Sequence, residues 1–172
     1  MKPRIKRIIL LIIITFCFQS LSSARLGSLL REQSGGFSFR IPEDWQVLEY
    51  PSLKYRIAVG RIAAGFRSNM NVVDEEFSGD LESYTQASIA NITQYFPSLK
   101  LISTNDFKTS SGITGKKIIT QVKQRGNPLQ QVYYLFKGKR GKYIVITCST
   151  LQADGNAYLP IFDRCMRTLE LF

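Results

Sequence analysis

Three strand-like segments joined by short turns constrain the fold of this chain more than any other feature. They cover Lys116–Lys123, Gln130–Lys137 and Lys142–Thr150, and glycine-containing turns separate them. Turns this short join neighbouring antiparallel strands, so the segments predict a β-meander. The middle segment contains the run VYYLF, which places apolar side chains on both faces of a strand. A sheet built from such strands has to be covered on both sides.

Two amphipathic segments are predicted to supply that cover as helices. The first begins at Asp80, whose carboxylate can accept hydrogen bonds from first-turn amides, and it ends before Pro97. The apolar stripes are Leu81, Tyr84, Ser88, Ile92, Tyr95 and Phe96 in this helix, and Tyr158, Ile161, Phe162, Cys165 and Leu169 in the last one. The order of elements predicts an α+β fold with a single antiparallel β-sheet flanked by helices on both faces, an α/β/α sandwich.

Shorter strands precede the first helix. The run FSFRI at 37–41 alternates apolar and polar residues, and 55–59 and 70–73 are predicted as two further strands. Residues 25–35 mix leucines with serine, glycine and charges, which indicates an N-terminal arm or a short helix before a domain at 36–172. Trp45 follows a proline turn, and we expect its bulky indole to be largely buried.

Residues 1–24 have the pattern of a secretory signal peptide. Four basic residues precede the apolar run IILLIIITFCF, and small polar residues follow it up to Ala24. We expect cleavage after Ala24 and a periplasmic or extracellular location. A retained membrane anchor is the alternative, but the apolar run is about half of the roughly 20 residues that a span needs. Acylation of Cys17 is disfavoured because the bulky Phe16 precedes it.

Composition excludes several classes of function. The chain has 172 residues, 23 Lys and Arg, 13 Asp and Glu, and no His. Without histidine, most catalytic triads and zinc sites are excluded. Removing the leader lowers the net charge from +10 to about +6, and no basic stripe supports nucleic-acid binding. We therefore expect no nucleic-acid partner, no cofactor, no metal and no transmembrane span after cleavage, and a monomer.

Export leaves two cysteines, Cys148 and Cys165. Cys148 lies in a predicted strand and Cys165 in the apolar stripe of the last helix. If the helix packs on the strand, the two sulfurs can form a disulfide in an oxidising compartment. Two buried free thiols are the alternative. A catalytic cysteine is disfavoured because no histidine is available to generate a thiolate.

A set of motifs resembles the Mog1/PsbP-like superfamily, nearest to its exported bacterial PsbP-like and DcrB-like members. The motifs follow the family's order from residue 36 to the end of the chain. They are Gly36–Phe39 with Ile41, Pro42 and Trp45, then Asn69–Val73, then Tyr143–Thr147, and finally Phe162 and Asp163 with Thr168. The resemblance implies an antiparallel sheet flanked by helices. It also implies a binding or accessory protein rather than an enzyme, with no catalytic residues to carry over.

Two charged clusters are candidate sites. Lys137, Lys139, Arg140 and Lys142 lie on one predicted hairpin, and they can contact an acidic partner or anionic lipid head groups. A solvated turn protected from edge aggregation is the favoured alternative. The acids Asp74, Glu75, Glu76, Asp80 and Glu82 lead into a helix, where negative charge is stabilising, so a structural role is favoured over a metal site.

Other motifs carry less weight. The segment GITGKK at 112–117 lacks the spacing of a phosphate-binding loop, and Asn91–Thr93 is a glycosylation sequon that matters only in a eukaryotic secretory pathway. The sequence therefore predicts a non-catalytic exported binding or accessory protein of the cell envelope, acting on an envelope protein, a membrane surface or a small ligand. The alternatives are an extrinsic photosystem II-type assembly or stability factor and, less favoured, a small hydrolase that needs no histidine.

Overall fold

The computed structural model describes residues 25–139 and 141–172, which form ten strands and two α-helices. The predicted signal peptide and Arg140 lie outside the described residues. Within them, no helix is long and apolar enough to cross a membrane. The elements are β1 (Leu26–Glu32), β2 (Phe37–Pro42), β3 (Gln46–Leu48), β4 (Ile57–Ala63), β5 (Phe66–Glu76), α1 (Leu81–Tyr95), β6 (Lys100–Lys108), β7 (Thr114–Gln124), β8 (Asn127–Lys137), β9 (Lys142–Leu151), a 3-10 turn (Gln152–Asp154), α2 (Gly155–Arg167) and β10 (Glu170–Leu171).

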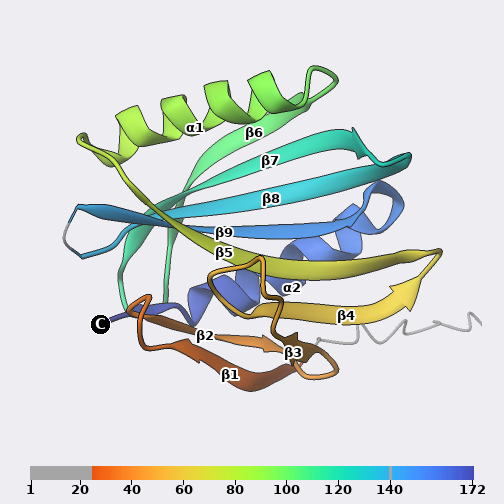
Figure 1. Cartoon of the computed structure of the whole chain (residues 1–172), viewed down its shortest axis with the longest axis horizontal. Helices are drawn as coiled ribbons and strands as arrows, with labels where there is room; N and C mark the ends of the chain where they lie inside the picture. The colour runs from red at the N-terminus through yellow and green to blue at the C-terminus, as the bar shows by residue number, and fades with distance from the viewer. Residues whose placement is uncertain (1–24, 140) are drawn as a thin grey trace, which may run out of the picture.

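The strands form two sheets rather than the single sheet that we predicted (Figure 1). A seven-stranded antiparallel sheet has the order β3-β4-β5-β9-β8-β7-β6, and β1, β2 and β10 form a separate three-stranded sheet. The predicted meander is present as β7, β8 and β9. The second sheet arises because 26–32 is a strand rather than an arm or a short helix. It pairs with β2, and this hairpin packs across the large sheet instead of extending it.

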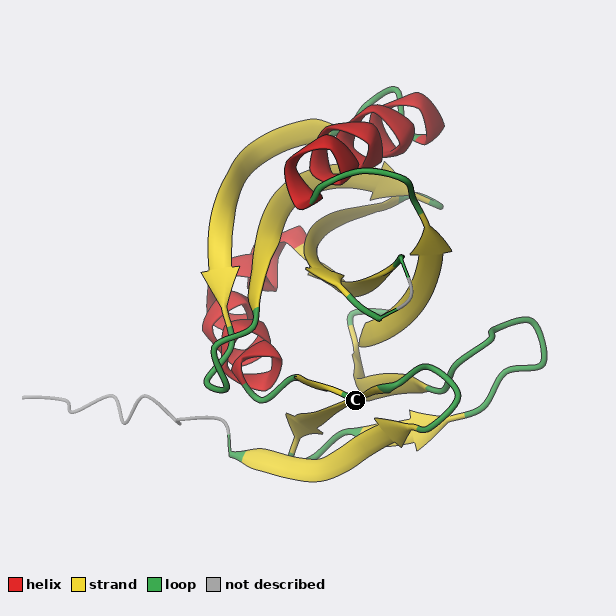
Figure 2. Cartoon of the chain, turned by 90° about the vertical axis from the view of Figure 1, so that its left-hand side faces the viewer, coloured by secondary structure: helices red, strands yellow, loops and turns green. Residues whose placement is uncertain are grey.

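Each face of the large sheet has a different cover (Figure 2). Helix α1 lies over β7 and β8, and its Tyr84 stacks on Tyr143 at the start of β9 with ring centroids 4.0 Å apart. Helix α2 and the three-stranded sheet together cover the opposite face. Two covered faces explain why β8 is apolar on both sides. The predicted α+β class, with a mostly antiparallel sheet and two helices, is therefore confirmed, whereas the α/β/α sandwich is not, because one layer combines α2 with a small second sheet.

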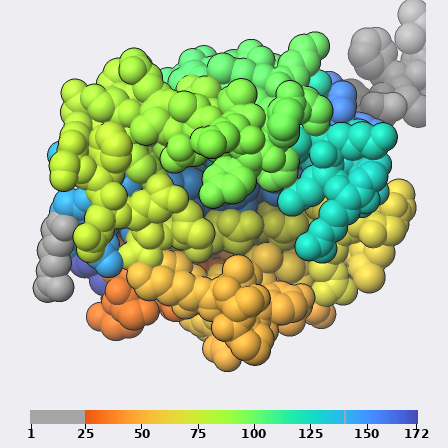
Figure 3. All heavy atoms as spheres, turned by 45° about the horizontal axis from the view of Figure 1, so that its top comes forward, coloured from red at the N-terminus to blue at the C-terminus, as the bar shows by residue number. Residues whose placement is uncertain are grey.

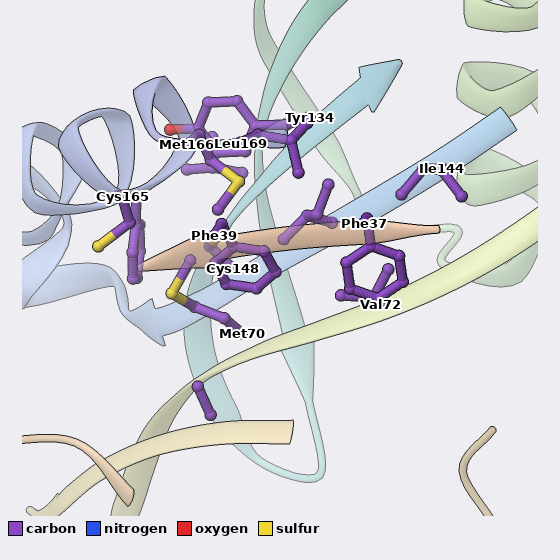
Figure 4. Packing of buried hydrophobic residues seen from close by; sticks show 14 of the residues in the cluster. Phe37, Phe39, Met70, Val72, Tyr134, Ile144, Cys148, Cys165, Met166 and Leu169 are labelled. Carbon is purple, nitrogen blue, oxygen red and sulfur yellow. The ribbon is translucent and has the colours of Figure 1, made fainter. Parts of the chain in front are cut away.

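The main core lies between the large sheet and the layer of α2 and β2. Phe37 and Phe39 of β2 project into it, with Cys165 of α2 on one side and Met70 of β5 and Cys148 of β9 on another (Figure 4). All five side chains are fully buried. Because β2 contributes two phenylalanines here, the N-terminal hairpin is an integral part of the fold.

One local prediction is supported and one needs correction. Trp45 is only partly exposed and packs against the main core, where it contacts Tyr158 and Phe162 of α2 at ring-centroid distances of 6.2 Å. Tyr95 is 81% exposed although we placed it on the apolar stripe of α1. The helix ends at this residue, and Phe96 already leaves the helical conformation.

The predicted start of α1 is confirmed. The Asp80 carboxylate accepts a hydrogen bond from the backbone amide of Ser83 at 2.8 Å. This bond satisfies a first-turn donor that has no partner within the helix. The strand β5, which contributes to the candidate site, leads along the chain to the start of α1.

Candidate binding site

Loops from separate parts of the chain meet at one end of the molecule, on the left in Figure 1 and facing the viewer in Figure 2. The turn between β1 and β2, the turn between β8 and β9, and the last residues of the chain surround a hollow of about 310 Å³. We call it the hairpin hollow. Its lining includes Lys139, Lys142, Gln33, Ser34 and Phe172. The described charged side chains of this lining are both basic.

Asp74 of β5 holds two lysines near this hollow. Lys142 Nζ donates to Asp74 Oδ2 at 2.9 Å, and Lys54 Nζ donates to Asp74 Oδ1. The strand register explains the first contact. Asp74 pairs with Ile144 of β9, and Lys142 lies two residues before Ile144 on the same face. Lys54 reaches the same carboxylate from the loop between β3 and β4. One carboxylate therefore serves two ammonium groups.

The Asp74 carboxyl is ionised over the whole ordinary pH range. Its side chain is only 5% exposed, and this burial by itself would raise the pKa. The hydrogen bonds and charges of Lys54 and Lys142 outweigh burial and lower the pKa of Asp74 to about 2. In turn, Asp74 raises the pKa of Lys54, and the neighbouring Tyr55 makes a smaller contribution in the same direction. The cluster therefore has a net charge of +1.

A second hollow, of about 410 Å³, opens beside the loop between β3 and β4. This loop is the orange bulge in Figure 3, and we call the space beside it the loop hollow. Tyr50 and Leu53 line it and are 45% and 43% exposed. Arg56 and Glu32 also line it and form an ion pair with Nε and Oε1 2.8 Å apart. Lys54 and Tyr55 form the part of the lining nearest Asp74.

Tyr55 is the unusual member of this lining. Its side chain is 4% exposed, and its hydroxyl has no hydrogen-bond partner among the residues that the structure describes. The ring meets Phe37 edge-on at 5.1 Å between centroids, and Lys54 Nζ lies 5.1 Å from the Tyr55 ring centroid. Gly35 closes the other side, since a Cβ there would lie 2.9 Å from Tyr55 Cε1. A buried hydroxyl without a partner costs free energy.

The structure separates the four basic residues that we grouped from sequence. Lys139 and Lys142 line the hairpin hollow, while Lys137 is exposed on β8 and does not. Arg140 lies outside the described residues. Lys142 is partly neutralised by Asp74, so the hairpin carries less free positive charge than its sequence indicates. Sequence reasoning missed Lys54 and Tyr55, because nothing in the sequence indicates that their loop folds beside Asp74.

The acidic cluster is divided among different partners. Asp80 caps α1, Glu75 accepts a hydrogen bond from Tyr84 at 2.7 Å, and Glu82 pairs with Lys116 at 2.8 Å. In the described ranges, no three acidic or cysteine side chains gather closely enough to hold a metal ion. These acids therefore stabilise α1 and its contact with the sheet.

Cys148 and Cys165, the two cysteines among the described residues, are free thiols in the structure and are buried in the same core cluster. Burial, together with the nearby Cys165 and Asp163, raises the pKa of Cys148 well above its usual value. Burial also raises the pKa of Cys165 to about 12. Neither thiol is poised as a nucleophile. The structure brings β9 and α2 together as the face patterns predicted, and the disulfide itself stays a prediction.

Comparisons with known proteins were made by sequence and by structure. No family model matches the sequence, and neither does any curated protein. Among solved structures, cyanobacterial PsbP (CyanoP) from Synechocystis sp. PCC 6803 superposes with a TM-score of 0.60 at 13% identity. The match covers 89% of this chain and 96% of that chain. The chain has the PsbP-like fold. The resemblance that we inferred from sequence motifs is thereby confirmed at the level of fold.

Two further solved structures share the PsbP-like fold. LpqN from Mycobacterium tuberculosis, described as involved in cell envelope biogenesis, has a TM-score of 0.59 at 11% identity. That match covers 78% of this chain and 82% of LpqN. Protein PA94 from Pseudomonas aeruginosa has a TM-score of 0.54 at 19% identity, and the match covers 84% of this chain and 96% of PA94. At these identities the likeness establishes the fold alone.

Proposed function

We propose that this protein is exported and serves as a non-catalytic accessory protein of the cell envelope that works by binding. The observation that carries the proposal is the arrangement at the hairpin end. Two open hollows flank the cluster of Lys54, Asp74 and Lys142, whereas both thiols are buried in the core. Concave surfaces with a few convergent polar groups are typical of binding sites.

Two further observations support export and a binding role. Residues 1–24 have the charge and apolar order of a secretory leader. The PsbP-like fold is shared with LpqN, which is described as acting in cell envelope biogenesis. The photosystem II alternative has support of the same kind, a likeness of fold to cyanobacterial PsbP at 13% identity, and it stays the alternative proposal.

Cell fractionation of the tagged full-length chain tests export. We expect the protein outside the cytoplasm, with residue 25 at its mature N-terminus. A matched variant that replaces Ile12 and Ile13 with Asp should stay in the cytoplasm at full length, because charges destroy the apolar core of the leader. Full-length wild-type protein in the cytosol would contradict the proposal.

A separate experiment tests the absence of catalysis. The purified protein should show no turnover of ester, phosphoester, peptide or glycoside substrates. A rate that follows the protein through purification and disappears in a variant of a single exposed hydroxyl or carboxyl group would contradict the proposal and favour the hydrolase. Histidine-dependent mechanisms are already excluded by composition.

A further inference from the structure

We propose that the loop hollow binds a ligand that carries an oxyanion, a carboxylate or a phosphate, on an apolar body. The oxyanion would contact Lys54 Nζ and Tyr55 Oη, and the apolar body would lie against Tyr50 and Leu53. This inference deepens the proposed binding function and rests on it. It is carried by the charge at Asp74, the unpartnered Tyr55 hydroxyl and the chemistry of the hollow's walls.

The charge at Asp74 favours an added anion. Lys54 and Lys142 share the Asp74 carboxylate, so these three groups together carry a net charge of +1, with Lys54 lining the loop hollow and Lys142 the hairpin hollow. The Lys54 ammonium has three N–H donors and gives one to Asp74. Its side chain is 55% exposed on the side of the loop hollow, so the other donors can reach a ligand.

The hydroxyl of Tyr55 supplies the second contact. It is buried at the wall of the loop hollow without a partner among the described residues, and Lys54 lies across the same ring. The hydroxyl is fully covered in the structure, so the proposed contact requires the Lys54 side chain, which is 55% exposed, to move when the ligand binds. An oxyanion placed there would satisfy a donor that the folded chain leaves unsatisfied, which is a gain specific to the bound state.

The remaining lining selects the rest of the ligand. Tyr50 and Leu53 present exposed apolar surface beside the ammonium group, so an anion with an apolar body buries more surface than a bare ion. The two acids of the lining do not prevent this. The carboxylate of Glu32 is paired with Arg56. Glu49 is exposed, so solvent and salt screen its negative charge.

The test is an NMR titration of the ¹⁵N-labelled protein with four probes. Hexanoate and hexyl phosphate carry the oxyanion and the apolar body, hexanol carries the body alone, and inorganic phosphate carries the anion alone. We expect amide shifts within residues 50–56 with the first two probes and weaker binding of the other two. The stronger of the two anions identifies the head group. Equal binding of hexanol, or no shifts with either anion at millimolar concentration, would overturn the proposal.

Variants separate binding from folding. Tyr55→Phe should weaken hexanoate or hexyl phosphate binding by about tenfold, the effect of one hydrogen bond to a charged group. It should not lower the free energy of unfolding, because it removes a hydroxyl that has no partner among the described residues. Tyr95→Phe, on an exposed side chain of α1 that does not line the loop hollow, is the matched control and should bind normally.

Lys54→Gln should weaken binding by a similar factor, whereas Lys123→Gln on β7 should not. Unchanged affinity in both Tyr55→Phe and Lys54→Gln would overturn the site. Because these measurements use purified protein, their failure would remove this ligand and leave the export and turnover experiments unaffected. Failure of export would show instead in the fractionation.

Discussion

Gly60 of β4 lies directly against the indole of Trp45, so that a Cβ added at residue 60 would be 3.0 Å from Trp45 Cε2. The other side of the indole packs on Tyr158 and Phe162 of α2. Trp45 therefore fills the space between an edge of the large sheet and α2. This contact links the loop after β2 to both layers of the main core.

The first prediction concerns this contact. Trp45→Ala should lower the free energy of unfolding by about 2–4 kcal/mol, near the lower part of the range for buried tryptophan because the indole is half-buried. Gly60→Ala should cost about 1–3 kcal/mol, because the added methyl group forces the indole to move. Chemical denaturation of the purified variants measures both.

The double variant provides the control. In the Trp45→Ala background, Gly60→Ala should cost much less than in the wild type, because the clashing ring is gone. Additive costs of the two substitutions would show that Gly60 is required for its backbone rather than for its contact with Trp45.

The second prediction concerns Asp74. Since its pKa in the folded state, about 2, lies below the ordinary value of 3.8, its ionised form stabilises the fold above about pH 4. This contribution is lost as the pH falls toward 2. Asp74→Asn should lower the free energy of unfolding at pH 7 by about 1–3 kcal/mol, because it weakens hydrogen bonds to charged groups.

Urea denaturation at pH 7, 4 and 2 tests this sign. The difference between wild type and Asp74→Asn should shrink between pH 4 and pH 2. Asp44→Asn, at an exposed turn, is the matched acid and should have little effect at any of these pH values. A difference that stays constant across the three pH values would contradict the assigned role of Asp74.

The third prediction concerns the attachment of α2 to the sheet. Tyr134 of β8 donates a hydrogen bond to Asp163 of α2 at 2.6 Å, and Lys117 of β7 pairs with the same carboxylate. Burial, together with nearby negative groups including Asp163, raises the pKa of Tyr134, so the phenol stays protonated as a donor. Tyr134→Phe should cost about 1–2 kcal/mol in the free energy of unfolding.

A matched hydroxyl is available for comparison. Tyr95 is 81% exposed, and Tyr95→Phe should leave the free energy of unfolding within about 0.5 kcal/mol of the wild type. Thermal or urea unfolding measures both variants. Equal effects of the two substitutions would show that the Tyr134 hydrogen bond does not stabilise the fold.

The fourth prediction concerns Cys148 and Cys165 in the exported protein. An oxidising compartment favours a disulfide between two thiols that share one core cluster. Protein purified from the exported fraction and denatured without reductant should therefore gain no alkyl groups by intact-mass measurement. Two alkylated thiols would contradict the prediction and leave both cysteines as packing residues. Protein that was reduced before denaturation should show two alkylated thiols and serves as the control.

The fold was predictable where local patterns determine it. Short turns and alternating apolar residues predicted β7, β8 and β9, and the Asp80 cap with Pro97 predicted α1. The N-terminal hairpin was not predictable in the same way. The run LGSLLRE becomes a strand only because β2 pairs with it and the resulting hairpin packs on the core.

The candidate site shows the same division more clearly. Lys139 and Lys142 could be found from sequence because they lie close together on a hairpin. Lys54, Tyr55 and Asp74 could not be grouped, because their contacts depend on how the loop between β3 and β4 folds over β5. No local signal in the sequence records that arrangement.

The sequence by itself determined the elements whose causes are local: the alternation that makes strands, the caps and prolines that bound helices, and the apolar faces that require cover on both sides. Only the tertiary structure decided that α2 and a second sheet together cover one face of the large sheet. It also decided that Asp74 holds two lysines from distant segments beside an unpartnered Tyr55. The physical reason is that ion pairs and buried hydroxyls depend on distances between segments, which only the packed core establishes.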